Sequence, residues 1–480
     1  MESEKKLFLR NIVGFSFVTW VSFLVGVLSQ PIATRLFSPD QLGVINMFNI
    51  NANLFVAFSM LGLDQAFVRF YHERPSQVTK KYFATILPLA SLLFLSIVGI
   101  LVSIFFWRQV SADTFSEANQ LLVVAMVAFA LARTGLRFLN LQYRVEQNIK
   151  WFSIQGILAV VTTKILYLAV AFWNATYTPA IIVLTITNVV LTIVFTVIQR
   201  KSYSFRLKLP DKNFIKTISV FAIPLIPVTI IAWLNNSISA IVVTRMLGFY
   251  SLGIYTAGLT LAGTINIIQA GFNAYWAPYV FQNYKTHAHH FKSIHKLLAC
   301  CVTFFGLAII ILQEPAFLLL GERFRGAMHF FAFLLIAPIC YTLAETTGLG
   351  IGISKKTYWN PIIFVISILF NVIACLILIP RVGLAGAGMA SALGGIISLT
   401  LRTIIGERYY KSIQSYKHSI SSITLLIMAS LASYLYSGNR AVKYSILAAL
   451  LMVAIIIFSN ELGKLFITAK EMVQNRHDTK

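Results

Sequence analysis

The sequence predicts an all-α polytopic membrane protein with about fourteen transmembrane helices. We expect two parallel six-helix repeats to form an N-lobe and a C-lobe around a central cavity, with two additional helices at the C-terminal end. Three observations lead to this prediction. Of the 480 residues, 58% are hydrophobic and only 11% are charged, whereas a soluble domain carries about 25% charged residues. The chain also contains many apolar runs long enough to cross a bilayer, and one motif occurs twice at a fixed spacing.

The apolar runs fill most of the chain and alternate with short polar connections. A helix of about 20 apolar residues spans a bilayer. The first run follows the basic start of the chain, but it is longer than the apolar core of a signal peptide and further spans follow it, so we expect it to remain as a helix. The expected spans lie near residues 11–31, 42–63, 83–107, 119–140, 152–173, 178–199, 217–241, 251–272, 294–313, 328–350, 361–379, 384–405, 419–436 and 444–460.

The formal net charge of +23 comes from basic residues that gather on one side of the predicted membrane. Thirty of the 39 Lys and Arg residues lie in or beside connections that face one side, eight face the other, and Lys164 lies inside the fifth span. Short loops rich in Lys and Arg stay in the cytoplasm, so both termini are predicted to be cytoplasmic. A nucleic-acid site would concentrate these charges in one segment, so we expect no nucleic-acid partner.

A motif near residue 34 recurs near residue 244. Thr34-Arg35-Leu36-Phe37, followed after four residues by Leu42-Gly43-Val44, matches Thr244-Arg245-Met246-Leu247 followed by Leu252-Gly253-Ile254. Both copies follow the first span of a six-span block, and an even number of spans gives both blocks the same orientation. Transporters place their substrate between such repeats. We therefore predict an N-terminal lobe over 1–205, a C-terminal lobe over 206–410, and two further helices and a cytoplasmic tail over 411–480, with a basic linker at 200–216.

Three segments resemble those of a known family. They are the stretch from Asn371 through Pro380, Gly383, Gly386 and Gly388 to Ser391, the stretch Thr34–Gly43, and the outer loop Gly321-Glu322-Arg323-Phe324. The chain resembles, over almost its whole length, the polysaccharide transporters of the multidrug/oligosaccharidyl-lipid/polysaccharide exporter superfamily, and the Wzx-type repeat-unit flippases in particular. Independently of the resemblance, Pro380 is expected to end a helix, Gly383 to permit a turn, and Gly386 and Gly388 to let the next helix pack closely.

The resemblance implies a function. It implies that an undecaprenyl-diphosphate-linked oligosaccharide is moved across the bacterial cytoplasmic membrane by alternating access, for O-antigen, capsule or other surface polysaccharide. The lipid-linked oligosaccharide and membrane lipids are then partners, and a polysaccharide polymerase and a chain-length regulator are candidate partners. The alternative from the same superfamily is a drug or cation antiporter. A membrane enzyme of glycan assembly would need a large catalytic outer loop, and none of the predicted outer loops is long.

Three basic residues are candidates for binding the anionic part of the substrate. Charges inside a membrane are costly and usually mark a pathway or a partner. Lys164 lies near the middle of the fifth span, where it either faces a cavity or forms a structural ion pair with a carboxylate. Arg133 and Arg137 share one face of the fourth span and could hold a diphosphate through paired hydrogen bonds. For Arg137, anchoring to anionic lipid is an equal alternative.

Polar residues in other spans are candidates for the cavity wall. Asn46, Asn49 and Asn53 fall on one face of the second span. Thr256 and Thr260 have a similar depth in the eighth span, and Asn235 and Asn236 lie near the end of the seventh. Amides suit sugar hydroxyls, which both donate and accept hydrogen bonds. Hydrogen bonding between helices is the alternative role for all of them.

Two carboxylates are candidates for coupling transport to H⁺ or Na⁺. Asp64 ends the second predicted span and Glu345 lies within the tenth. Glu345 could instead pair with Lys355 or Lys356 just beyond that span.

No other cofactor and no metal is expected. The histidines 287, 289, 290 and 295 are expected in a solvated loop because they share no helical face and have no carboxylate or Cys nearby. The sequence has no phosphate-binding Gly-x-x-x-x-Gly-Lys-Ser/Thr loop, so we expect a transporter and not an enzyme.

Overall fold

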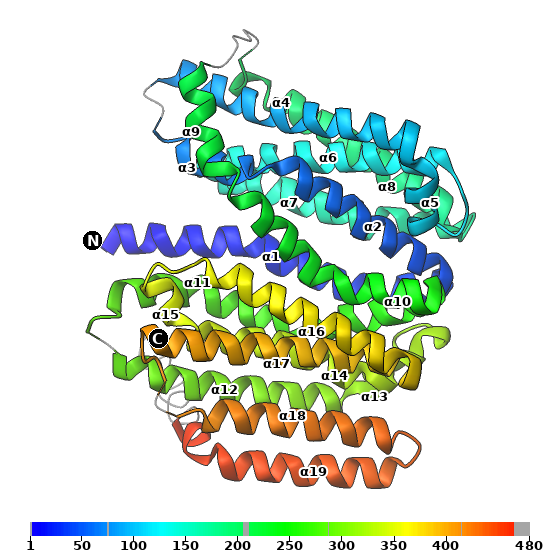
Figure 1. Ribbon diagram of the computed structural model, residues 1–480, viewed down its shortest axis with the longest axis vertical. Coiled ribbons are helices and arrows are strands. Elements are labelled where there is room, and N and C mark those ends of the chain that lie inside the picture. Colours follow the sequence, from blue (N-terminus) through cyan, green and yellow to red (C-terminus); the bar gives the residue numbers. More distant parts are fainter. Residues whose placement is uncertain (1, 74–75, 205–210, 287, 414, 465–480) are drawn as a thin grey trace, which may run out of the picture. The chain divides into compact units, whose positions relative to one another are not determined.

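The computed structural model describes residues 2–73, 76–204, 211–286, 288–413 and 415–464, and all regular secondary structure in these ranges is helical (Figure 1). The chain forms two compact units. Unit 1 contains Met1–Ala257 and Leu320–Phe324, and unit 2 contains Gly258–Leu319 and Arg325–Lys480. The division into 1–205, 206–410 and 411–480 follows the sequence repeat and remains a prediction. The predicted linker 200–216 includes residues 205–210, which lie outside the described ranges.

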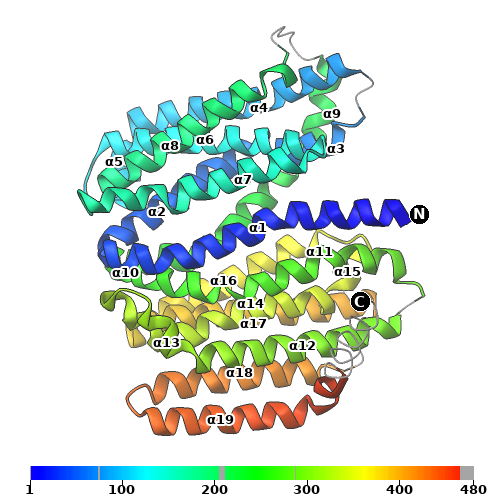
Figure 2. The same ribbon diagram turned by 180° about the vertical axis from the view of Figure 1, so that it is seen from behind.

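Unit 1 is built around α6, which packs against α2, α4 and α8, while α1 packs against α7. The long helices of this unit are joined by shorter elements that reverse or redirect the chain (Figures 1 and 2). The helices are α1 (Glu2–Leu36), α2 (Pro39–Met60), α3 (Leu63–Phe70), α4 (Gln77–Leu101), α5 (Trp107–Thr114), α6 (Gln120–Val145), α7 (Ile149–Lys164), α8 (Tyr177–Ile198) and α9 (Lys212–Ala222). A π-helical segment, Val102–Phe106, and 3₁₀ segments at Leu166–Phe172 and Arg200–Ser202 lie between them.

Unit 2 has α14 at its centre, in contact with α12, α17 and α18. Helix α16 packs along α17, and the last two helices, α18 and α19, lie side by side (Figure 2). Helix α10 (Leu225–Ala262) belongs to unit 1 up to Ala257, and only its last turn lies in unit 2. The other helices of unit 2 are α11 (Ile265–Asn283), α12 (Ala288–Ile311), α13 (Gln313–Leu318), α14 (Met328–Thr347), α15 (Leu349–Ile353), α16 (Trp359–Val382), α17 (Leu384–Tyr409), α18 (Lys417–Leu435) and α19 (Arg440–Ile457). A 3₁₀ segment, Glu322–Ala327, precedes α14.

Thirteen helical segments in the described ranges are long and apolar enough to cross a membrane, against fourteen predicted spans. The difference arises in the 51-residue segment Lys212–Ala262, which covers the seventh predicted span and the start of the eighth. The backbone of Gly248 leaves the helical conformation there, with φ 79° and ψ 179°, so a kink separates the two spans. The eighth span was predicted to end at residue 272. In the structure, the helix breaks at residues 263–264 and α11 then continues to Asn283, eleven residues further.

The Pro-Gly segment between α16 and α17 behaves largely as predicted. Gly383 has φ 60°, a left-handed conformation that glycine adopts without strain. A Cβ on Gly386 would lie 2.5 Å from the backbone carbon of Leu378, so only glycine allows this approach. The prediction that Pro380 ends the helix is wrong by two residues. The helix continues to Val382 because Pro380 removes only its own N–H, and the turn at Gly383 then stops it.

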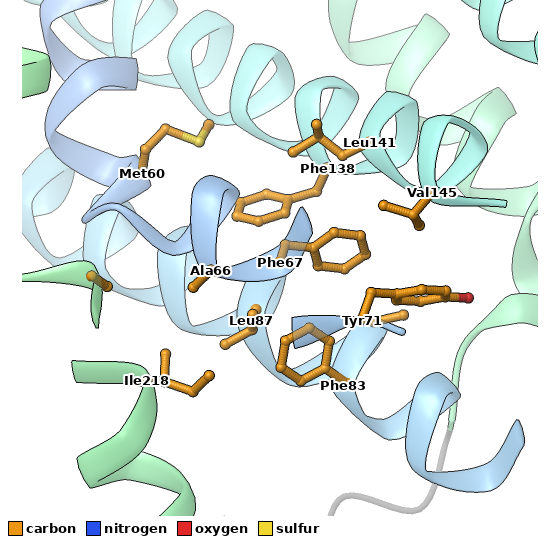
Figure 3. Close-up of a cluster of buried hydrophobic side chains, with 12 residues drawn as sticks. Met60, Ala66, Phe67, Tyr71, Phe83, Leu87, Phe138, Leu141, Val145 and Ile218 are labelled. Carbon is orange, nitrogen blue, oxygen red and sulfur yellow. The ribbon is translucent and has the colours of Figure 1, made fainter. Parts of the chain in front are cut away.

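A buried aromatic cluster fixes the short helix α3 against its neighbours in unit 1. Phe67 of α3 lies between Phe83 of α4 and Phe138 of α6, with ring centroids 5.7 and 6.0 Å away (Figure 3). Tyr71 and Ile218 extend the cluster. Burying one such aromatic side chain stabilises the fold by roughly 1.5–3 kcal/mol. The position of α3 is therefore set by packing.

Candidate functional site

Unit 1 contains a cavity of about 470 Å³ between α1, α2, α6 and α7. Its wall combines apolar side chains with a group of cationic, amide and hydroxyl side chains. The polar residues that line it are Ser22, Asn53, Arg133, Arg137, Asn140, Gln155, Thr163 and Lys164. Four of the predicted site residues, Asn53, Arg133, Arg137 and Lys164, are thus brought together in one cavity.

The three cations of the cavity come from two helices. Arg133 and Arg137 lie one turn apart on α6, and Lys164 is the last residue of α7, just before the 3₁₀ segment. Within the described part of the chain, neither Arg133 nor Lys164 has a carboxylate within ion-pairing distance. The alternative role of Lys164 in a structural ion pair therefore finds no partner there. The cavity wall presents an excess of positive charge.

Arg137 differs from the other two cations because it is paired with Asp64. Its Nη2 and Nε atoms donate to the same oxygen, Oδ2 of Asp64, at 2.6 and 3.1 Å. The Asp64 side chain is 8% exposed and that of Arg137 is 50% exposed. The expectation that Asp64 ends the second span is wrong, because α2 stops at Met60 and the turn at Gly62 places Asp64 in α3.

Amide side chains form the polar wall beside the cations. Asn140 donates through Nδ2 to Oε1 of Gln155 at 3.3 Å, and buried Gln155 donates through Nε2 to the Leu136 carbonyl at 3.2 Å. Together they cross from α6 to α7. Sequence reasoning did not single out Asn140, Gln155, Ser22 or Thr163. A periodicity count on α6 and α7 could have placed Asn140 and Gln155 near the basic residues, since Arg133, Arg137 and Asn140 follow i, i+4, i+7 spacing.

The other six predicted wall residues lie outside the lining of this cavity. Asn46 donates through Nδ2 to Thr256 Oγ1 at 2.7 Å, and Asn49 donates to the Ile45 carbonyl of its own helix at 2.9 Å. Asn236 is exposed and donates to the Ala232 carbonyl. The residues outside the lining of the unit 1 cavity are Asn46, Asn49, Asn235, Asn236, Thr256 and Thr260. For Asn46 and Thr256, the hydrogen bond between helices is the role that the geometry displays.

Glu345 lies in unit 2, in a smaller pocket of about 160 Å³. Its Oε1 accepts a hydrogen bond from Gln269 Nε2 at 3.2 Å and lies 4.0 Å from Nη1 of Arg402. The expected alternative pairing with Lys355 or Lys356 is not the one formed. Because α17 runs beside α14, it places Arg402 opposite Glu345. Both predicted coupling carboxylates, Asp64 and Glu345, therefore face an arginine of their own unit.

The expectation of a solvated loop is wrong for His295, whereas His290 is exposed as expected, although it lies in the first turns of a helix. His295 is 1% exposed on α12, with Nδ1 2.8 Å from Thr346 Oγ1 and Nε2 3.1 Å from Ser419 Oγ. The helix begins at Ala288, so the segment is helical and turns His295 into unit 2. His287 lies outside the described residues. No group of three or more His, Cys, Asp or Glu suited to a metal occurs among the residues that the structure describes.

A second polar network lies at the end of α6, beside the aromatic cluster. The Tyr71 hydroxyl donates to Glu146 Oε1 at 3.2 Å and accepts from Gln142 Nε2 at 3.1 Å. Burial and the negative charge of Glu146 raise the pKa of Tyr71 to about 12. The phenol therefore stays protonated and acts as a fixed donor. This network and the Asp64–Arg137 pair both tie the region of α3 to α6.

Comparison with known proteins assigns the chain to a family and identifies solved structures with a similar fold. A model of the family described as "Polysaccharide biosynthesis protein" matches residues 8–284, more than half of the chain. No protein with a curated description matches the chain in sequence. Among solved structures, the lipid II flippase MurJ in an inward closed conformation is similar over 95% of this chain and 99% of its own, with a TM-score of 0.67 and 14% identity.

Multidrug transporters share the same fold at lower similarity. The MATE multidrug transporter DinF-BH is similar over 84% of this chain and 95% of its own, with a TM-score of 0.58 and 16% identity. An inward-facing MATE family transporter of the MOP superfamily is similar over 80% and 94%, with a TM-score of 0.54 and 15% identity. At these identities the likeness establishes the fold alone, a two-lobed fold like those of MurJ and the MATE transporters.

Proposed function

The chain belongs to the polysaccharide biosynthesis protein family, and from that premise we propose that it is a flippase for lipid-linked oligosaccharides. Its substrate is an undecaprenyl-diphosphate-linked repeat unit, which it moves across the bacterial cytoplasmic membrane by alternating access. The product supplies the synthesis of a surface polysaccharide such as O-antigen or capsule.

The cationic cavity of unit 1 is the observation that carries this proposal. Arg133 and Lys164 have no carboxylate partner in the described ranges, and Arg137 lies one turn from Arg133. Placing an unpaired charge within the membrane costs free energy. Binding of a charged ligand offsets that cost, so unpaired charges there indicate a binding site. Guanidinium groups bind phosphate oxygens in pairs. A diphosphate headgroup matches the sign and the chemistry of this wall.

The amide side of the cavity suits the sugar part of the substrate. Asn53, Asn140 and Gln155 present both donors and acceptors, as sugar hydroxyls require. A cationic drug would meet three positive groups in the same space, which disfavours the antiporter alternative. The similar fold of MurJ, whose structure is described as that of a lipid II flippase, supports a lipid-linked cargo.

The charge distribution supports the proposed location of the protein. The excess of Lys and Arg in alternate connections supports a multi-pass inner-membrane protein with both termini in the cytoplasm. The Arg137 end of α6 then faces the cytoplasm, where the lipid diphosphate is made. A polymerase and a chain-length regulator would use the product. H⁺ or Na⁺ remains the candidate coupling ion, with Asp64 and Glu345 as candidate sites.

The decisive experiment uses a strain that lacks this protein. Undecaprenyl-diphosphate-linked repeat units should accumulate on the inner leaflet while the surface polysaccharide disappears, and the intact gene should reverse both effects. The accumulation on the inner leaflet is measured by labelling the lipid-linked units in intact cells, where only the outer leaflet is accessible, and in the lipids extracted from them. The loss of surface polysaccharide is measured by immunoblot. Normal polysaccharide together with new sensitivity to cationic drugs would refute the flippase proposal in favour of the antiporter.

A further inference from the structure

A buried carboxylate behind the cavity wall is bonded to one of the three cations that line the cavity. Asp64 Oδ2 occupies two donors of Arg137, Nε and Nη2, at 3.1 and 2.6 Å. These two atoms form one edge of the guanidinium, and a guanidinium edge of this kind can donate two parallel hydrogen bonds to a phosphate. Arg137 lines the cavity and is half exposed, whereas Asp64 is buried behind it. A headgroup in the cavity and Asp64 therefore share the same cation.

Asp64 is held firmly in place. Gly62, with φ 71°, starts α3, and a Cβ on it would lie 2.3 Å from the Ala222 carbonyl oxygen, so the turn packs directly on α9. On the other side of Asp64, Phe67 is fully buried in the aromatic cluster (Figure 3). The carboxylate cannot swing away from the cavity without disrupting this packing. Arg137, with its long side chain, is the partner that can move.

The other charged groups around α3 do not replace Arg137 as the partner of Asp64. Arg69 of α3 is paired with Glu73. Lys80 of α4 lies over the ring of Tyr71, 5.8 Å from its centroid, and Lys212 and Lys216 of α9 are exposed. Gln65 is a weak neighbour, since its Nε2 lies 3.4 Å from Asp64 Oδ2. The charge of Asp64 is therefore balanced mainly by Arg137.

We propose that Asp64 is a positioning residue that keeps the anionic headgroup releasable by competing with it for Arg137. The inference rests on the proposed function and adds a role for one residue of the same site. A transporter must bind its substrate strongly enough to load it and weakly enough to let it go. Three unopposed cations in a low-dielectric cavity would hold a diphosphate tightly. The carboxylate of Asp64 lowers that attraction, and its ion pair with Arg137 forms again when the headgroup leaves.

The experiment measures binding and turnover of the purified full-length protein in nanodiscs and proteoliposomes. Inorganic diphosphate is the binding probe, followed by calorimetry, and lipid-linked oligosaccharide is the transport substrate. Asp64→Asn should bind diphosphate about tenfold more tightly, because a charge-assisted pair no longer competes. Its transport should show a lower KM together with a lower kcat. Asp113→Asn breaks the exposed pair with Arg245 in the same unit and should change neither quantity.

A second pair of variants tests the proposal even where Asp64→Asn alone folds poorly. Arg137→Gln alone leaves the Asp64 charge unopposed beside the cavity, so diphosphate binding should weaken about tenfold or more. Adding Asp64→Asn to Arg137→Gln should recover much of that loss, whereas a purely structural Asp64 would make the double variant worse. Unchanged or weaker binding by Asp64→Asn, with an unchanged KM, would overturn the role of Asp64 alone. Wild-type protein that binds no diphosphate and transports no lipid-linked oligosaccharide would overturn the proposed function, and this inference with it.

Discussion

Asn46 and Thr256 are joined by a hydrogen bond of 2.7 Å, and they are separated by 210 residues, the same spacing that relates the two copies of the sequence motif. The glycines of the motif show the same relationship. A Cβ on Gly43 would lie 2.0 Å from the Phe249 carbonyl oxygen, and one on Gly253 would lie 2.0 Å from the Pro39 carbonyl oxygen. Since Phe249 is also 210 residues after Pro39, the contacts are reciprocal. The start of α2 and the second part of α10 cross as symmetric equivalents within unit 1.

Gly43→Ala and Gly253→Ala should each destabilise the protein. The added methyl group meets a backbone oxygen at 2.0 Å, and a backbone oxygen cannot move aside as a flexible side chain can. Overpacking of this kind costs about 1–3 kcal/mol. The thermal unfolding midpoint of the purified protein measures the effect. Gly26→Ala, which has no atom within 4 Å of its added Cβ, is the matched control and should leave the midpoint unchanged or raise it. Equal midpoints for all three variants would contradict the crossing.

The fold was predictable to the extent that it depends on local apolar length and on the repeated motif. The runs that became α6, α8 and α17 were identified within a few residues because hydropathy alone selects a bilayer-spanning helix. The kink at Gly248 was not predicted, since nothing local distinguishes it from the other glycines of the chain. The reciprocal contacts of Gly43 and Gly253 depend on which helices cross. Sequence spacing identified the pair, and only the packing explains why both are glycine.

Glu314 should make the stability of unit 2 depend on pH. Its carboxylate accepts a hydrogen bond from Lys443, which is 2% exposed, and also faces Arg440. The hydrogen bond from Lys443 and the two positive charges lower the pKa of Glu314 below its ordinary value of 4.5, and burial opposes them only in part. A lowered carboxyl pKa adds stability above the unfolded pKa and loses it as the pH falls through the folded value. The wild-type unfolding midpoint should therefore fall below about pH 4.5.

Glu314→Gln isolates this effect. At neutral pH it should be less stable by about 3 kcal/mol, because Lys443 is left buried without its carboxylate. Its midpoint should depend less on acid than that of the wild type. The double variant Glu314→Gln with Lys443→Met removes both charges and should recover most of the loss. The same acid dependence in wild type and Glu314→Gln would show that another group is responsible.

His295→Ala should destabilise unit 2. The imidazole is buried and contacts Thr346 and Ser419, so its loss leaves two hydroxyls without that partner and opens a void. An unsatisfied buried polar group costs about 1–3 kcal/mol. The unfolding midpoint measures the change. His329→Ala, at an exposed position, is the control and should behave as the wild type. A metal-dependent midpoint in the wild type would instead argue for a ligand role.

The cavity was only partly predictable from the sequence. Arg133, Arg137 and Lys164 were identified because charges within apolar spans are rare and costly. Gln155 and Asn140 were missed because amides near span ends carry no such signal. The polar face of α2 illustrates the limit of periodicity, since Asn53 lines the cavity while Asn46 bonds Thr256. Residues on one helical face lie on the same side of the helix, but the helices that they contact change along its length. Periodicity alone therefore does not identify the neighbours of each residue.

Arg133→Glu should impair transport more strongly than Arg133→Lys. Glutamate would place a carboxylate in the cavity wall, in addition to that of Asp64 behind it, and would repel an anionic headgroup. Lysine keeps the positive charge and loses only the paired hydrogen bonds. We expect Arg133→Lys to retain measurable surface polysaccharide and Arg133→Glu to retain none. Polysaccharide per cell, normalised to the protein in the membrane fraction, measures this. Equal tolerance of both substitutions would argue against contact with an anionic headgroup.

Lys164→Ala should abolish transport while protein level and membrane insertion stay normal. Lys164 is exposed to the cavity at the end of α7 and has no carboxylate partner in the described ranges, so its removal breaks no ion pair there. Loss of one charge-assisted contact to a phosphate lowers binding by about tenfold or more. Lys164→Arg keeps the charge and should retain part of the activity. Lys150→Ala, at an exposed position in the first turn of the same helix, controls for the loss of any lysine. Full polysaccharide in Lys164→Ala would remove this residue from the substrate site, whereas loss in Lys164→Ala alone would place its charge on the transport path.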